Sequence, residues 1–520
     1  MKSIKSLIII LGLIFSVSSC NDATDIIQDG ELGNGNTFRT VNDLAQFLNG
    51  SVYSSLGNTN EIMISASFTD ECGIGPNNGG QELELHRFNL NQTTGYVSGM
   101  WIGHYTVINR VNRLIEASAL ITPNAAVDVE VEPGVFISEV DYYNAILAEA
   151  RAVRAYSYFQ LLSYFSTDLS DDSALGVMLF DYVPAIDEKL PRSTNGEVFA
   201  LIESDLAFAD SNIYNRTAAS GYKYASSNMI AALRARMYLY RKNYTLAKQY
   251  AQQVVTSSGL SLTLATPYVA ANFYNETTTT NPYRRIWADL SQGEVLFALS
   301  RPTGGSWGNI AGGFFFNITN ATGGAFLDMG RNLFNELREV NGDIRGLAFV
   351  DPTSLIDASY LTNPAYNTSD VLVIDKYPGK PTQPLRSDIK IFRLSEMYFI
   401  LAECAVAENQ LATAAGYIKN IRDARNRLSA QPLPSYADQQ QAWADILKER
   451  RKELCFEGHR YMDIKRLGVA ANKSIDRNIT DDLILSLPTT IPNNDHRFTL
   501  PIPQDEIAGN PTIQQNPGYN

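Results

Sequence analysis

The stretch SSNMIAALRARMYLYRKNYTLAKQYAQQVVT (residues 226–256) decides the fold of this chain. It holds two segments whose apolar residues have the spacing of one helix face, and the polar residues 241–243 separate them. Ala235 in the first segment precedes Ala247 in the second by 12 residues. Small residues at this offset let two antiparallel helices approach closely, as in a tetratricopeptide repeat. The stretch therefore predicts a tetratricopeptide-like helix pair.

The same spacing of apolar and small residues recurs on both sides of this pair. Apolar residues spaced by three and four predict helices within 146–165 and 391–406, and Ala402 precedes Ala414 by the same 12 residues. Further pairs are expected at 41–56 with 96–118, at 146–165 with 196–211, and at 439–457 with 459–467. The long intervals inside the first two pairs depart from a 34-residue period, so each predicts a loop on one side of the stack.

Residues 259–385 have a different character. Gly, Pro, Thr and Asn interrupt short apolar stretches such as EVLFALS and VLVIDKY, which predicts loops, short strands and an occasional helix. The chain then returns to helical patterns over 386–520. The predicted fold class is mostly α, with helical parts at 38–258 and 386–520 that share one core. The irregular segment is an insertion packed against them.

The N-terminus has the pattern of a targeting segment. Lys2 and Lys5 precede the apolar run 7–17, which is too short to span a bilayer as a helix. Val-Ser-Ser directly before Cys20 resembles a bacterial lipobox. We therefore expect residues 1–19 to be a signal peptide and residues 20–37 a flexible tether that is lipidated at Cys20. The alternative is an ordinary secretory signal that happens to contain a cysteine.

Composition excludes several functions. The 520 residues carry a net charge of −13, which repels phosphate backbones, so nucleic acid is not an expected partner. Only four His and four Cys occur, without the spacing of metal ligands, and neither a nucleophile elbow nor a phosphate-binding loop is present. We expect no metal, no cofactor and no catalytic residue. Carboxylates are abundant, so a glycosidase pair stays open from composition alone.

The cysteines after Cys20 form no complete disulfide framework, because their number is odd. Cys404 and Cys455 lie in helical patterns, and we interpret both as small buried hydrophobes. Cys72 lies in a polar stretch that gives it no assigned role.

The stretch ERRKELCFEGHRYMDIKRLG (449–468) is dense in paired charges. One interpretation is acid/base chemistry among Glu453, Glu457, His459 and Asp463. The favoured interpretation is a salt-bridge lattice around a tight helix–Gly–helix corner, since pairs on helix surfaces are common and weakly stabilising.

With these pieces in order, the chain resembles the SusD/RagB family of Bacteroidetes nutrient-binding lipoproteins. The matching pieces are the lipobox at Cys20, Trp101 to Asn112, and residues 151–165, 197–209, 223–240, 392–405, 449–468 and 510–519. A local departure at 165–176 replaces the shorter Gly/Pro-bearing link of the family and affects only a loop.

The resemblance implies a SusD-like fold in which four tetratricopeptide-like helix pairs support an irregular ligand-binding half. Such proteins lie on the outer face of the outer membrane. They cap a SusC-like, TonB-dependent β-barrel transporter, pass oligosaccharides or peptides to it, and do not catalyse.

Two loops combine aromatic rings with polar groups, and we expect them to form the ligand site. One spans 67–80, and the other runs from Tyr283 to residue 317. The predicted ligand-binding residues are Trp307, Trp287, Tyr283, Phe314, Phe68, Asp70, Glu71 and, at the start of its helix, Trp101. Trp307 is the first choice, because glycines flank it and no periodicity would bury it. The alternative is that Trp287 and one or two of Phe314, Phe315 and Phe316 only anchor the insertion to the helices.

The sequence leaves three functions to distinguish: binding of an oligosaccharide, binding of a peptide, and hydrolysis at the cell surface. An oligosaccharide would stack on rings beside polar side chains. A peptide would use extended backbone hydrogen bonds and pockets, and the low count of four Trp keeps this alternative open. A surface hydrolase is disfavoured by the missing catalytic motifs.

Overall fold

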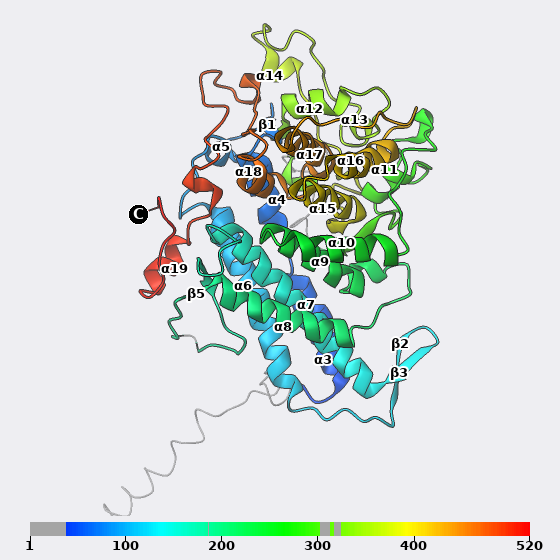
Figure 1. Cartoon of the computed structure of the whole chain (residues 1–520), viewed down its shortest axis with the longest axis vertical. Helices are drawn as coiled ribbons and strands as arrows, with labels where there is room; N and C mark the ends of the chain where they lie inside the picture. The colour runs from blue at the N-terminus through cyan, green and yellow to red at the C-terminus, as the bar shows by residue number, and fades with distance from the viewer. Residues whose placement is uncertain (1–37, 186, 302–311, 317–323, 520) are drawn as a thin grey trace, which may run out of the picture.

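Paired helices form the scaffold of this computed structural model (Figure 1), which describes residues 38–185, 187–301, 312–316 and 324–519. The helices of the N-terminal part are α3 (Val41–Phe47), continued by a π-helix (Leu48–Tyr53), α4 (Thr59–Phe68), α5 (Leu83–His86), α6 (Gly95–Ser118), α7 (Glu139–Phe165), α8 (Asn195–Asn212), α9 (Ser227–Tyr240) and α10 (Tyr244–Ser257). Those of the C-terminal part are α15 (Leu394–Ala407), α16 (Leu411–Arg425), α17 (Gln439–Leu454), α18 (Arg460–Leu467) and α19 (Gln504–Gly509).

The helix pairs expected from the small-residue spacing are confirmed. Helix α9 packs on α10 and α15 packs on α16, with Ala235, Ala247, Ala402 and Ala414 all fully buried. The other pairs also form, since α6 packs on α3, α7 on α8 and α17 on α18. Side-chain hydrogen bonds to the first backbone N–H groups fix where several of these helices begin. The Asn243 side chain, for example, accepts a hydrogen bond from the Leu246 backbone N–H and caps α10.

The irregular segment contains short elements, as expected. Its helices are α11 (Pro282–Trp287), α12 (Arg331–Arg338), α13 (Arg345–Ala348) and α14 (Tyr366–Ser369). The strands of the molecule are β1 (Cys72–Ile74), β2 (Asp128–Glu132), β3 (Val135–Ser138), β4 (Leu175–Met178), β5 (Arg192–Thr194), β6 (Val295–Leu299), β7 (Leu327–Met329), β8 (Gly379–Lys380), β9 (Gln383–Pro384) and β10 (Ile389–Arg393). They pair antiparallel as β1–β7, β2–β3, β4–β5, β6–β10 and β8–β9. The β6–β10 pair connects the insertion to the start of the C-terminal helices.

One hydrophobic cluster runs through the described residues from Val41 to Tyr519, so N-terminal, inserted and C-terminal segments contribute to the same core. The three described cysteines are free and fully buried, which confirms the interpretation of Cys404 and Cys455. Cys72 lies in β1, opposite Met329 of β7.

The charge-dense stretch 449–468 forms the predicted lattice, but its expected position on a helix surface is wrong. Glu453 is fully buried, and its carboxylate accepts hydrogen bonds from Arg393 at 2.7 Å, Arg425 at 2.8 Å and Arg345 at 3.2 Å. Burial alone would raise the pKa of Glu453, but Arg425 and Arg393 hold it well below its usual range. The helical spacing shows which residues share a face, and here that face is covered by the insertion.

The lattice joins separate parts of the chain. Arg393 ends β10 and also donates to Glu294, which precedes β6, at 2.8 Å. Lys376 of the insertion donates to Glu457 at 2.7 Å. The corner between α17 and α18 turns through Gly458, whose φ of +84° is a conformation that side chains with a Cβ rarely adopt. The lattice therefore fixes the insertion on the C-terminal helices.

The first predicted ligand loop is also interior, so its three candidate side chains are not available at the surface. Phe68, Asp70 and Glu71 are fully buried at the end of α4 and before β1. Both Asp70 carboxylate oxygens accept hydrogen bonds from Arg460, each at 2.7 Å. Burial alone would raise the pKa of Asp70, but Arg451 and Arg460 lower it instead. These groups have structural partners, which the polar appearance of the loop did not reveal.

Glu71 is the exception in this cluster, because none of the described cationic side chains forms an ion pair with its carboxylate. Its oxygens accept a hydrogen bond from the Phe456 backbone N–H at 3.2 Å and one from Ser65 at 3.4 Å. Burial, with the nearby charge of Asp70, raises the pKa of Glu71 from 4.5 to about 8. At neutral pH the folded chain holds a proton there that the unfolded chain has released.

Replacing Glu453 by Gln should destabilise the protein by roughly 3–5 kcal/mol, because it removes the charge that three buried arginines share. Urea unfolding of the two proteins would measure this difference. The matched control is Glu339→Gln, which neutralises an exposed pair with Lys448 and should cost less than about 1 kcal/mol. Equal effects of the two substitutions would contradict the structural role of the lattice.

Replacing Glu71 by Gln should flatten the pH dependence of stability between about pH 4.5 and 8. In the natural protein the stability contributed by this site is full below pH 4.5. It is lost as pH rises toward 8, because only the unfolded chain gains by ionising freely. Melting temperatures measured across this range should therefore fall less steeply for Glu71→Gln than for the natural chain or Glu339→Gln. Parallel curves would show that Glu71 is already ionised in the folded state.

Candidate functional site

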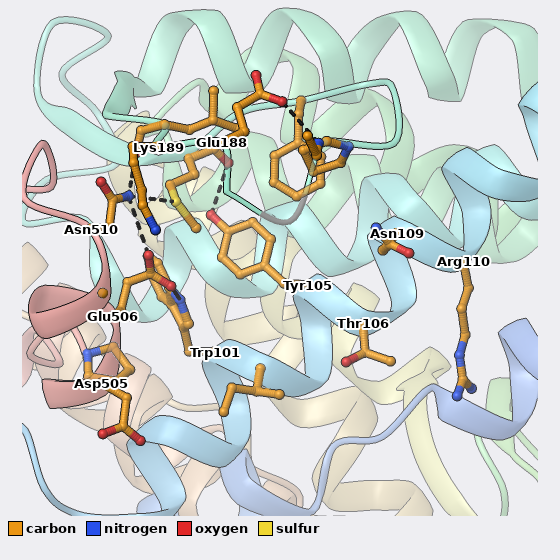
Figure 2. A pocket seen from close by; sticks show the side chains of 18 of the residues that line it. Trp101, Tyr105, Thr106, Asn109, Arg110, Glu188, Lys189, Asp505, Glu506 and Asn510 are labelled. Carbon is orange, nitrogen blue, oxygen red and sulfur yellow. Dashed lines mark hydrogen bonds between the residues drawn. The ribbon is translucent and has the colours of Figure 1, made fainter. Parts of the chain in front are cut away.

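The larger of two candidate concave surfaces is a groove of about 760 Å³ between α6, the segment 178–190 and α19, which we call the α6 groove (Figure 2). Apolar side chains form much of its floor: Trp101, Ile102, Tyr105, Met178 and Phe180. Ile102 lines the groove and leaves 57% of its surface exposed, although it belongs to helix α6. A large exposed aliphatic side chain inside a concave surface is typical of a binding site.

The aromatic rings of the α6 groove are mostly covered. Trp101 is only 2% exposed, lies edge-on to Tyr105 and Phe165, and donates from Nε1 to Glu506 at 3.1 Å. Tyr105 stacks on Phe180 with ring centroids 5.5 Å apart and donates to the Met178 carbonyl. The rings therefore offer edges more than open faces.

Charged side chains lie at both ends of the α6 groove. Asp505 and Glu506 of α19 lie beside Trp101 in Figure 2, and Arg110 lies at the other end, one turn before Arg113. Arg110 donates to the Ser51 carbonyl, and Arg113 to the Asn109 side chain. Within the described ranges neither arginine forms an ion pair with a carboxylate.

The second concave surface, the insertion pocket, has a volume of about 320 Å³. All of its lining residues come from the irregular segment 259–385: Glu276, Phe316, Asp351, Ile374, Asp375, Tyr377, Pro378, Lys380, Thr382, Pro384 and Leu385. The half-buried ring of Phe316 thus lines the same pocket as the carboxylates of Glu276, Asp351 and Asp375. This combination of a ring with acceptors suits a ligand that carries hydroxyl groups.

The carboxylates of the insertion pocket have different surroundings. Asp375 is buried and forms an ion pair with Arg284 at 2.8 Å, and burial nevertheless raises its pKa to about 7. Asp351 is half-exposed, and one of its oxygens accepts hydrogen bonds from the Thr353 backbone N–H and hydroxyl. The other oxygen of Asp351 has no hydrogen-bond partner among the described residues, so it can accept from a ligand.

The predicted residues of the second loop separate into two groups. Tyr283 and Trp287 are fully buried, because 282–287 forms helix α11 and not a surface loop. Arg425 lies over the Tyr283 ring, and Lys376 and Arg393 lie over the Trp287 ring. This position agrees with the alternative interpretation, in which Trp287 anchors the insertion to the helices. Phe314 is half-buried and contacts Phe315 edge-on.

Trp307 lies outside the described residues, but both flanks of its segment reach the insertion pocket. Lys380 donates to the Arg301 carbonyl at 2.6 Å, and the Gly312 backbone N–H donates to the Leu385 carbonyl at 3.0 Å. The first expected loop meets the chain just after the second one, because β1 pairs with β7 and the Asn77 backbone N–H donates to the Ala325 carbonyl. Trp101 lines the α6 groove and does not line the insertion pocket.

Sequence reasoning missed the groups that line these surfaces. Asp351 and Asp375 each follow a short apolar run, AFV and VLVI, and a carboxylate directly after a buried run is a usable signal for a pocket edge. The contribution of α19 has no comparable signal, because Asp505 and Glu506 lie in a polar stretch 400 residues from α6.

No group of three or more His, Cys, Asp or Glu side chains in the described part of the chain could hold a metal ion. None of the described helices has the length and apolarity required to cross a bilayer. Residues 1–37, including Cys20, lie outside the described residues.

Known proteins are similar to this chain over most of its length. The model of the SusD family matches residues 354–519. Among curated relatives, SusD-like protein P2 of Formosa agariphila is 23% identical over the whole of both chains. SusD-like protein P38 of the same organism is 24% identical, covering 84% of this chain and 83% of its own.

Solved structures give the same result for the fold. A SusD superfamily protein from Bacteroides thetaiotaomicron has a TM-score of 0.72 at 26% identity, covering 92% of this chain and 100% of its own. A SusD-like carbohydrate binding protein from Bacteroides vulgatus has a TM-score of 0.68 at 18% identity, covering 92% and 98%. The helix-pair scaffold with its irregular half thus has solved structural counterparts, and the family model, the curated relatives and these structures together support a SusD-like family protein.

Proposed function

We propose that this chain is a cell-surface lipoprotein that binds an oligosaccharide nutrient and delivers it to a SusC-like, TonB-dependent transporter in the outer membrane. Family membership supports the nutrient-binding role, and the carbohydrate-binding description of one structural neighbour supports the ligand class. The observation that carries the ligand assignment is the insertion pocket, where Phe316 lies with Asp351 and Asp375 in the irregular half.

The chemistry of the pocket fits a sugar. A hydrocarbon face of a pyranose can lie against the Phe316 ring, and its hydroxyls can donate to the free oxygen of Asp351. Lys380 at the wall is held by Asp388 at 2.5 Å, which leaves its position well defined. Trp307 remains the predicted additional stacking ring, since its segment begins and ends at pocket residues.

Binding without turnover is part of the proposal. The four residues first considered for acid/base chemistry, Glu453, Glu457, His459 and Asp463, are all buried. A peptide-binding subunit of the same kind of importer is the alternative role. Calorimetric titration with panels of oligosaccharides and peptides, repeated with Asp351→Asn, shows which of the two ligands the insertion pocket binds, and a turnover assay on candidate polymers tests for hydrolysis.

Asp351→Asn and Trp307→Ala should each weaken binding of the oligosaccharide identified in that screen by about tenfold. The first removes a charged acceptor and the second a stacking ring, each worth roughly 1–2 kcal/mol. Isothermal titration calorimetry measures the affinities, and thermal melting checks that both variants stay folded. The matched control, Asp505→Asn in the α6 groove, should bind the sugar as the natural protein does. Unchanged affinity in both pocket variants would place the sugar elsewhere.

Attachment is tested through Cys20. We expect the natural chain to incorporate a radiolabelled fatty acid and to co-purify with its transporter from outer membranes in mild detergent, because several acyl chains give stable anchoring. Cys20→Ala should lose the label and leave the membrane fraction. A labelled, membrane-bound Cys20→Ala protein would rule out this anchor, and recovery of the natural chain only as a monomer would count against the transporter.

A further inference from the structure

The proposed sugar site leaves the α6 groove, a concave surface of about 760 Å³, without a role. The α6 groove shares no lining residue with the insertion pocket, so the two are separate sites. A ligand for the groove must match its own floor and its own charges.

The floor of the α6 groove does not suit a neutral sugar. A pyranose binds a ring by its face, and here Trp101 is 2% exposed while Tyr105 is stacked on Phe180. What the floor does offer is aliphatic and edge surface, including Ile102 with 57% of its surface free. Such a floor suits apolar side chains of a ligand.

The ends of the α6 groove carry opposite charge. Asp505 is exposed and Glu506 is held at the Trp101 end by its hydrogen bond to the indole. Arg110 and Arg113 follow Trp101 by nine and twelve residues along α6. At 1.5 Å per residue, the arginine end lies ~14–18 Å from the acidic end.

Two further charged residues line the groove and reduce the difference in charge between its two ends without cancelling it. Lys189 lies near Asn510 at the acidic end in Figure 2, and Glu188 belongs to the same wall. Glu188 is already engaged, because its oxygens accept from the Tyr182 hydroxyl and the Ala185 backbone N–H. Each end therefore keeps an excess of its own sign, negative beside α19 and positive beside Arg110 and Arg113.

We propose that the α6 groove is a second binding site, which takes a short peptide with free termini. The peptide ammonium lies at Asp505 and Glu506, its carboxylate lies at Arg110 and Arg113, and apolar side chains contact Ile102. An extended chain advances ~3.3 Å per residue, so about five residues span the groove. This site goes beyond the proposed sugar-binding function and does not depend on it.

The test uses four versions of one pentapeptide of alternating alanine and leucine: free at both ends, N-acetylated, C-amidated, and blocked at both ends. Calorimetry with the full-length protein should show the free peptide binding about tenfold more tightly than the doubly blocked one. Each half-blocked peptide should lose about threefold, the effect of one exposed charge pair. Higher ionic strength should narrow these differences, because salt screens exposed charges.

Two substitutions assign the peptide direction. Arg113→Gln should weaken binding about threefold for peptides with a free carboxylate and leave C-amidated peptides unaffected. Asp505→Asn should do the same for peptides with a free amine and leave N-acetylated peptides unaffected. The matched control is Arg338→Gln, an exposed arginine outside the groove, which should change nothing.

Several results would overturn the proposal. They are equal binding of free and blocked peptides, absence of binding by all four, a substitution that weakens all four alike, and displacement of the peptide by the oligosaccharide. The sugar titration on the same preparation separates the two proposals. Sugar binding without peptide binding removes only the groove assignment, and peptide binding without sugar binding removes only the assignment of the insertion pocket.

Discussion

The buried carboxylate of Glu453 is the constraint on which the rest of the arrangement depends. Three guanidinium groups from β10, α13 and α16 converge on it, and each would be costly to bury without that charge. Because the partners come from the insertion and from the C-terminal helices, neither part can be completed alone. The insertion pocket lies in a segment whose position this lattice fixes, so a buried carboxylate outside the pocket helps to position its walls.

Much of the helical scaffold could be predicted, because it follows from local rules. The 12-residue offset between Ala235 and Ala247 reports directly how closely two neighbouring helices approach, and the structure has that pair. The turn at 241–243 and the cap at Asn243 are likewise encoded within a few residues. Such signals need no knowledge of the distant chain.

The candidate site was less predictable, because burial depends on contacts far along the sequence. Asp70 looks like a loop carboxylate until Arg460 covers it, and Trp287 looks like a loop ring until cations of the insertion and of β10 lie over it. Polar and aromatic residues near glycines have the same local pattern whether the loop faces solvent or the core. The α6 groove was hidden for the same reason, since one of its walls comes from the C-terminal end of the chain.

The pairing of Asp70 with Arg460 also sets an order of events. The two residues are 390 positions apart, and the unpaired carboxylate cannot be buried cheaply. An N-terminal segment that emerges first from a ribosome or a membrane channel therefore lacks its closing partner until nearly the whole chain has followed. Contacts of such long range also slow folding. For the cell-surface role proposed above this delay is useful, because the chain can cross a membrane before the pair closes.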